Sequence, residues 1–282
     1  THSASVSFGS GFADTITFAL SAGASNIDAS GANTAATIKV SANDAIFTST
    51  DTITGGNGTT DQLLITATSN SNSADLSNVS KFDTITLVAG ATGNETVTVV
   101  TGDGTIAASS TLTVNASALT GGTAKLTFNS AAESDVNATV SLTGSAGNDI
   151  IYLGNSNDSI NTGAGNDTIK FINGAALTNG DVINGGIGTD TINVGILNAA
   201  VNDSAFTNVS GIEVLDISAN MSANITLGAS FDASNIASVV VGETGSNKVI
   251  VASNFADTIT FALSAGNSNI DASGANTAAT IK

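Results

Sequence analysis

Short runs of alternating apolar and polar residues dominate the chain and predict β-strands. The stretches 37–40, 124–128 and 224–227 alternate in this way, and turn-forming Gly, Asn and Ser residues separate such runs. Successive residues of a strand face opposite sides of a sheet, so alternation marks a strand with one buried face. Helical period is missing from long windows, although a short helix is expected around Ala199–Phe206. The pattern therefore predicts an all-β protein.

The strand pattern comes in repeated phrases. The tetrapeptide Asp-Thr-Ile-Thr begins at residues 14, 51, 83 and 257. A longer phrase, Ser77-Asn-Val-Ser-Lys-Phe-Asp, is echoed by Thr207-Asn-Val-Ser-Gly-Ile-Glu. Many short strands separated by regular turns are typical of a β-solenoid or a sandwich.

One repeat is much longer than the others. Residues 11–39 reappear at 254–282 with two differences, Gly11 against Asn254 and Ala24 against Asn267. Such identity indicates a tandem array whose period is the offset between the copies, 254 − 11 = 243, and a recent local duplication is the alternative. In an array, both copies adopt the same fold, and each unit docks head-to-tail on the next to give an open fibre or sheet.

Composition and charge exclude several classes of protein. Six Lys and Arg residues face 23 Asp and Glu residues, which gives a formal net charge of -17. A nucleic-acid binder needs a basic surface, and an anionic membrane would repel this chain. The absence of Cys removes disulfides and thiolate metal sites, while 41% apolar residues are too many for a disordered acidic tail. No apolar stretch approaches the ~20 residues of a membrane span. An acidic chain of this kind suits hard cations with oxygen ligands, calcium above all.

Four nine-residue segments carry the most specific pattern: 144–152, 153–161, 162–170 and 185–193. Each has aspartate at its sixth position and isoleucine at its eighth. Glycines before the aspartate permit a tight turn, and the carboxylate with the turn carbonyls supplies the oxygens that calcium prefers. A metal-free Gly-Asn-Asp hairpin turn is the alternative. The segment 55–63 is the same motif with one extra Thr; it predicts either a calcium site at Asp61 or a plain turn.

The spacing of the aspartates predicts how the turns stack. Two nonapeptides form one coil of a parallel β-roll, so equivalent residues two nonapeptides apart lie side by side. Asp167 and Asp181 are separated by nine plus five residues, which predicts a five-residue bulge within Phe171–Leu177. The stacked pairs are then Asp149 with Asp167, Asp158 with Asp181, and Asp167 with Asp190, so Asp167 serves two pairs. The isoleucines expected in core rows are Ile151, Ile160, Ile169, Ile183 and Ile192. The predicted metal ligands are Asp149, Asp158, Asp167, Asp181, Asp190, Gly144, Gly147, Gly163, Gly165, Gly185, Gly188 and Asp61.

The nonapeptides resemble the repeats-in-toxin (RTX) pattern G-G-x-G-x-D-x-U-x, in which U is a large aliphatic residue. With their acidic, Cys-free, Thr-, Ala-, Ser- and Asn-rich surroundings, they resemble bacterial surface-layer (S-layer) proteins and giant RTX-type adhesins. The segments 113–121 and 209–215 are phrases of the same kind. The resemblance implies calcium-dependent folding outside the cell, export often by type I secretion, and self-assembly into a lattice or fibre.

Five segments follow from these features. They are a β-rich repeat segment at 1–39, a β-rich region at 40–143, a calcium β-roll at 144–195, a β-rich region at 196–253, and the start of the next tandem unit at 254–282.

The expected function is structural. The chain is expected to self-assemble with calcium into a cell-surface layer or filament, its partners being copies of itself, calcium and cell-surface polysaccharide. The alternative is the stalk of an adhesin or a biofilm-matrix protein, and a weaker one is the calcium β-roll of a secreted enzyme or toxin. No H-E-x-x-H or G-x-S-x-G motif occurs, and the recognisable Asp clusters lie in turn motifs, so no enzymatic activity is expected. Binding to nucleic acid and insertion into a membrane are not expected.

Overall fold

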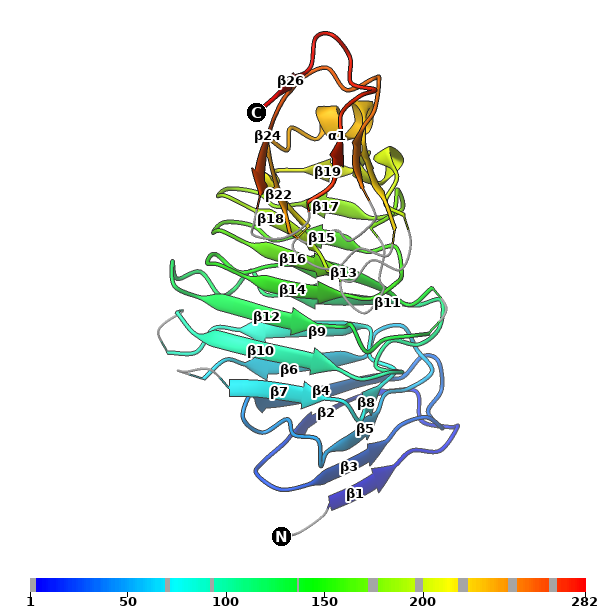
Figure 1. The fold of residues 1–282 in the computed structure, drawn as a ribbon. Helices are drawn as coiled ribbons and strands as arrows, with labels where there is room; N and C mark the ends of the chain where they lie inside the picture. Colours follow the sequence, from blue (N-terminus) through cyan, green and yellow to red (C-terminus); the bar gives the residue numbers. More distant parts are fainter. Residues whose placement is uncertain are drawn as a thin grey trace. The chain divides into compact units, whose positions relative to one another are not determined.

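The computed structural model describes residues 4–68, 72–91, 94–135, 137–171, 177–195, 200–217, 223–242, 248–263 and 268–282. The chain divides into two compact units, Thr1–Asp149 and Ile150–Lys282. Strands of each unit pair in parallel, and consecutive strands belong to different sheets (Figure 1). Each coil therefore pairs with the coils before and after it, which is the topology of a parallel β-solenoid. The predicted all-β fold is confirmed, with solenoid coils in both units.

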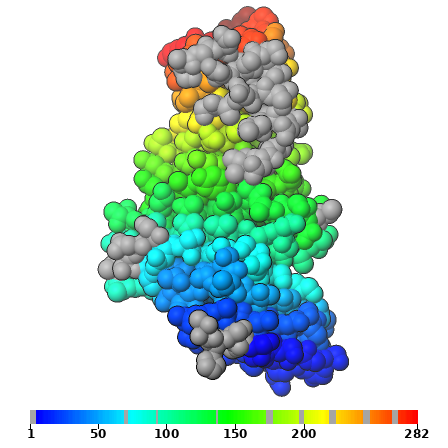
Figure 2. Space-filling model, turned by 60° about the horizontal axis from the view of Figure 1, so that its bottom comes forward, coloured from blue at the N-terminus to red at the C-terminus, as the bar shows by residue number. Residues whose placement is uncertain are grey.

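The first unit contains three parallel sheets, and its successive coils form bands from blue to green in Figure 2. The strands of the first sheet are, in order, β1 (Ala4–Ser7), β3 (Ser25–Asp28), β5 (Thr52–Thr54) and β8 (Val79–Ser80). Those of the second are β2 (Thr15–Ala19), β4 (Thr37–Asn43), β6 (Gln62–Thr66), β9 (Thr84–Val88), β11 (Thr111–Asn115) and β13 (Thr139–Thr143). Those of the third are β7 (Asn72–Leu76), β10 (Thr96–Thr101) and β12 (Lys125–Asn129).

The second unit is built in the same way. Its longest sheet runs β14 (Ile150–Leu153), β16 (Thr168–Phe171), β18 (Thr191–Val194), β20 (Val214–Ile217), β22 (Ser238–Val241), β24 (Thr258–Leu263) and β26 (Thr280–Ile281). A second sheet contains β15 (Ser159–Asn161), β17 (Val182–Asn184) and β19 (Val209–Ser210). A third contains β21 (Ile225–Leu227), β23 (Val249–Val251) and β25 (Ile270–Asp271).

The core of each unit consists of stacked rows of aliphatic side chains. Alternate residues of a strand point inward, and parallel registry places each one over its equivalent in the next coil. In the first unit one buried row is Val40, Leu63, Ile85, Val114 and Leu142. In the second unit the rows are Ile151, Ile169, Ile192, Leu215 and Val239, and Ile160 with Ile183. The predicted isoleucine rows are therefore confirmed.

Helical structure among the described residues is limited to two short elements of the second unit. A 3₁₀ helix, η1, spans Asp203–Phe206, inside the range where a short helix was expected. The α-helix α1, Ala229–Ala233, was not expected, because five residues are too few to display a helical period. The Asp203 carboxylate accepts hydrogen bonds from the N–H groups of Gly228 and Phe231, at 2.7 and 3.0 Å, and thereby satisfies free donors at the start of α1. Neither element is long or apolar enough to cross a membrane.

The two copies of the long repeat adopt the same local fold. In the first copy β2 pairs with β4 at Thr15 and Thr37; in the second β24 pairs with β26 at Thr258 and Thr280. The turns also match. The Asp28 carboxylate accepts the Ser30 N–H at 3.0 Å, and the Asp271 carboxylate accepts the Ser273 N–H at 3.1 Å. The registers with the preceding strand agree as well, with Val6 opposite Ile27 and Val249 opposite Ile270. The prediction of equivalent folds is confirmed for the described residues.

Candidate metal centre

The predicted calcium-binding aspartates of the second unit end the turns directly before strands β15, β16, β17 and β18. Asp158, Asp167, Asp181 and Asp190 are all at most 3% exposed. Parallel registry pairs Ser159 with Val182 and Thr168 with Thr191. Asp158 thus stacks on Asp181 and Asp167 on Asp190, as the sequence spacing predicts. The bulge that restores this phase was predicted within Phe171–Leu177, and its residues 172–176 lie outside the described ranges.

Carboxylates link consecutive coils by accepting main-chain hydrogen bonds. The N–H of Asp158 donates to Oδ1 of Asp181 at 2.9 Å, and the N–H of Asp167 donates to Oδ1 of Asp190 at 2.7 Å. The N–H of Asp190 in turn donates to Oε2 of Glu213 at 2.7 Å. Asp167, Asp190 and Glu213 therefore form one row of acidic residues along the solenoid. Hydrogen bonds to an ionised acceptor are stronger than neutral ones, so this row stabilises the stacking.

In this row, the pKa of the Asp190 carboxyl is clearly raised. Its pKa is raised to about 6, mainly by burial and in smaller part by the negative charges of Asp167 and Glu213, while the hydrogen bond from the Asp167 N–H opposes the rise. Among the described residues its Oδ2 atom is buried without a hydrogen-bond partner. A buried carboxylate oxygen without a donor is costly unless a proton or a cation compensates it.

Glycine is required in the turn before Asp190, because the neighbouring coils approach it closely. A Cβ atom on Gly185 would lie 2.0 Å from the carbonyl oxygen of Gly211 and 2.8 Å from Oδ2 of Asp190. A Cβ atom on Gly188, whose φ is +153°, would lie 1.7 Å from the carbonyl oxygen of Gly165. Main-chain bonds from Ile187 to Gly163 and from Gly165 to Ile187 join the two turns. The absence of side chains thus lets the carbonyl oxygens of Gly211 and Gly165 lie directly against this turn.

Asp181 is held differently from Asp190. Its Oδ2 accepts hydrogen bonds from the N–H and the hydroxyl of Thr178, at 2.8 and 3.1 Å. Burial raises the pKa of the Asp181 carboxyl, and the bonds from Asp158 and Thr178 partly offset that rise. Both carboxylate oxygens therefore already have protein donors, in contrast to Oδ2 of Asp190.

Asp149, Gly144 and Gly147 belong to the first unit. The Asp149 carboxylate accepts the N–H of Leu126 at 2.7 Å and the N–H of Ser145 at 2.6 Å. A Cβ atom on Gly147 would lie 1.9 Å from the carbonyl oxygen of Ala124, so this turn also needs glycine. Asp149 and Asp167 lie in different units, and their predicted pairing stays a prediction.

Asp61, the candidate in the motif with the extra Thr, is fully buried in the first unit. Its Oδ1 accepts the N–H of Ile38 and its Oδ2 accepts the N–H of Gly56, each at 2.6 Å. Burial raises the pKa of this carboxyl, and the two N–H groups oppose the rise. The assignment of Asp61 as a calcium ligand stays a prediction.

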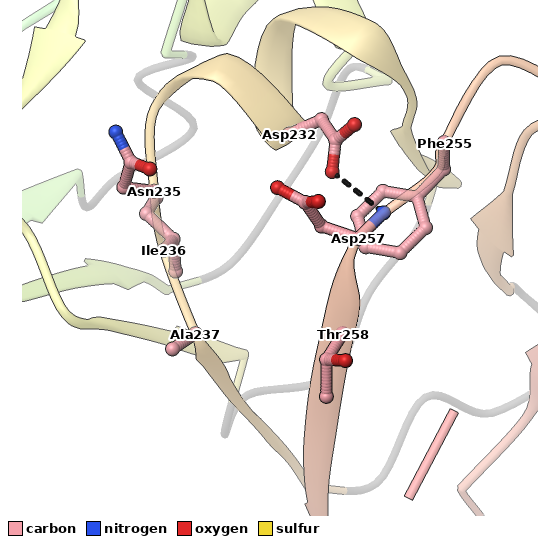
Figure 3. A pocket seen from close by; sticks show the side chains of 7 residues that line it. All are labelled: Asp232, Asn235, Ile236, Ala237, Phe255, Asp257 and Thr258. Atoms are coloured by element: carbon pink, nitrogen blue, oxygen red, sulfur yellow. Dashed lines mark hydrogen bonds between the residues drawn. The ribbon is translucent and has the colours of Figure 1, made fainter. Parts of the chain in front are cut away.

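Sequence reasoning did not identify Glu213 or the pair Asp232 and Asp257. The echo between the phrases at 77–83 and 207–213 is the signal that could have found Glu213, because it aligns Glu213 with Asp83. Asp232 and Asp257 line a pocket of about 330 Å³, in which the Asp232 carboxylate accepts the Asp257 N–H at 3.1 Å (Figure 3). Within the described ranges, no three His, Cys, Asp or Glu side chains converge as a metal-binding group. A calcium ion would therefore take several of its ligands from main-chain carbonyls.

Comparison with known proteins identifies the turns within residues 141–169. A family model of the RTX calcium-binding nonapeptide repeat, in 4 copies, matches residues 141–169. The segment 141–169 consists of RTX repeats. No curated protein sequence and no solved structure matches the chain. RTX repeats typically bind Ca²⁺ and are typical of secreted proteins. The Gly211 carbonyl oxygen and the buried Oδ2 of Asp190 are oxygen ligands of the kind that such an ion prefers, and they lie beyond the segment that the family model matches.

Proposed function

We propose that this chain is a non-enzymatic, extracellular structural protein that folds with calcium and self-assembles into a cell-surface layer or filament. The observation that carries the proposal is the equivalence of the two repeat copies, which share strands, register and turn contacts although they lie far apart in the sequence. Because the second copy has the same fold as the first, a further unit could follow it with the same strand pairing. Repeated units of this kind suit an extended assembly.

The charge balance supports a role for calcium. The sequence has 23 acidic and six basic residues, and the described residues form one ion pair, between Lys248 and Asp271 at 3.1 Å. Protein cations therefore neutralise little of the acidic charge. Divalent cations from the medium would reduce the repulsion, and binding confined to the folded chain would contribute its free energy to folding.

Electron microscopy and circular dichroism of the purified chain test the proposal together. We expect β-rich spectra and ordered sheets or filaments in millimolar calcium, and loss of both after chelation and dialysis. Calcium-dependent folding without ordered assembly would favour the adhesin-stalk alternative. A chain that folds and assembles equally well in chelator would contradict the proposal. Binding of cell-surface polysaccharide to the calcium-loaded assembly tests the remaining partner.

A further inference from the structure

A two-coil module occurs once in each unit. It begins with Thr48 in the first unit and with Thr178 in the second, and each copy contains an Asp, a Gly-Gly turn, a second Asp and an Asn-Val-Ser phrase followed by an acid. The first copy spans residues 48–83 and the second spans 178–213. Strands β5 and β8 pair with Ile53 opposite Val79, and β17 and β19 pair with Ile183 opposite Val209. The two copies therefore have the same strand register.

Three features of the two modules match. The Asp61 N–H donates to Asp83, and the Asp190 N–H donates to Glu213, each at 2.7 Å. A Cβ atom on Gly55 would lie 2.0 Å from the carbonyl oxygen of Lys81. In the second module, a Cβ atom on Gly185 would lie at the same distance from the carbonyl oxygen of Gly211. Lys81 and Gly211 also share a left-handed conformation, with φ of 58° and 60°. Two modules this similar allow a direct comparison of their turns.

The turns differ in how the carboxylate before the second strand is satisfied. The turn of the first module contains one extra residue, Thr60. In this turn the Gly56 N–H donates a hydrogen bond to Oδ2 of Asp61 at 2.6 Å. In the second module no described group donates to Oδ2 of Asp190. The residue whose N–H reaches Oδ1 also differs, being Ile38 in the first module and the acidic Asp167 in the second. The second turn thus has more negative charge and one donor fewer.

We propose that Asp190 and Glu213, together with the Gly211 carbonyl, bind a calcium ion that the equivalent Asp61–Asp83 turn does not require. Oδ2 of Asp190 and the Gly211 oxygen both face the space that a Gly185 side chain would occupy, at 2.8 and 2.0 Å from its Cβ position. The Glu213 carboxylate lies beside them, fixed by its bond to the Asp190 N–H. In the first module the Gly56 N–H donates the hydrogen bond that stabilises Oδ2 of Asp61, and in the second the cation takes that role at Oδ2 of Asp190. This inference rests on the proposed calcium-dependent function and extends the calcium row to a residue outside any nonapeptide.

Charge-removing substitutions that keep the hydrogen bond provide a matched test. Glu213→Gln and Asp83→Asn each delete one negative charge, and each amide oxygen can still accept the main-chain N–H. Calcium bound by the full chain is measured by equilibrium dialysis over a range of free calcium. We expect Glu213→Gln to lose one ion at calcium levels that saturate the original chain, with affinity for that ion reduced at least about tenfold. Asp83→Asn is expected to bind as many ions as the original chain.

The outcomes separate this inference from the proposed function. Unchanged binding by Glu213→Gln, or equal losses in both variants, would overturn the assignment of Glu213 while the other RTX sites still bind calcium. An original chain that binds no calcium would overturn the proposed function itself. Circular dichroism in saturating calcium checks that each variant folds. If Glu213→Gln does not fold, Glu213→Asp replaces it; this variant keeps the charge but shortens the side chain, and binding equal to that of the original chain would reject the site.

Discussion

At the residue scale, the aspartates of the turns differ in whether both of their carboxylate oxygens accept hydrogen bonds from the protein. Asp61 and Asp181 satisfy both of their carboxylate oxygens with protein donors, whereas Oδ2 of Asp190 has none among the described residues. The spacing of the aspartates correctly predicted two stacked pairs, Asp158 with Asp181 and Asp167 with Asp190. It could not predict which oxygen remains for a cation, because that depends on whether a turn N–H such as that of Gly56 reaches the carboxylate. Glu213 was missed for a related reason: it occupies the row without belonging to a nonapeptide.

The raised pKa of Asp190 predicts the pH dependence of stability without calcium. Its folded pKa of about 6 exceeds the unfolded value near 3.9, so the folded chain holds more protons between about pH 4 and 6. Stability in chelator should therefore fall as pH rises through this window, and burial shifts Asp61, Asp83 and Asp181 in the same direction. Calcium should remove most of the fall, because it takes the place of the proton. Scanning calorimetry at pH 4.5 and 7 checks this; a melting temperature in chelator that rises with pH would contradict it.

At the element scale, the coil is the unit that the sequence specifies. Strand β14 pairs with β16, and β16 pairs with β18 across a longer stretch of chain, yet Ile151, Ile169 and Ile192 stay in one buried row. Alternation of apolar residues determines which side chains point inward, so insertions between strands leave the core unchanged. Alternation does not determine how the turns close. For that reason the short helix α1 could not be predicted from the pattern.

Neighbouring residues of β17 provide a test of this core. Ile183 is fully buried, while Val182 is 49% exposed on the outer face. We expect Ile183→Ala to destabilise the folded chain in saturating calcium by about 2–5 kcal/mol, because it removes buried methyl groups and leaves a cavity. Val182→Ala should change the free energy of unfolding by no more than about 0.5 kcal/mol. Urea unfolding followed by circular dichroism measures both. Equal effects would mean that Ile183 does not lie on the inward face of β17.

At the scale of the whole molecule, the chain combines coils that differ in what holds them together. The coils of residues 150–194, the RTX coils, contain buried carboxylates, whereas the coils around α1 contain Phe206, Phe231 and Phe255. The ring centroids of Phe206 and Phe231 lie 5.0 Å apart, and those of Phe231 and Phe255 lie 6.3 Å apart. The sequence predicted the repeat and the solenoid because both follow from periodicity. It did not predict the phenylalanine stack, since its members are distant in sequence and no repeated phrase links them. In a solenoid each coil contacts its neighbours, so local differences in stability should persist in the intact chain.

Calcium removal should therefore loosen the RTX coils before the phenylalanine-containing coils. With Asp167 and Asp190 as the predicted calcium ligands, chelation would leave their carboxylates without a cation, so amides in 150–194 should lose protection from hydrogen exchange first. Amides in 225–241 should lose it later, because this segment packs on buried Phe231 and its one acidic residue, Asp232, is only partly buried. In calcium, Asp167→Ala should reproduce the loss more strongly than Asp158→Ala, because Asp167 is predicted to serve two stacked pairs. Exchange measured by mass spectrometry at increasing chelator concentration checks both expectations. Simultaneous loss of protection in the two segments, or earlier loss at 225–241, would show that calcium does not act through the RTX coils.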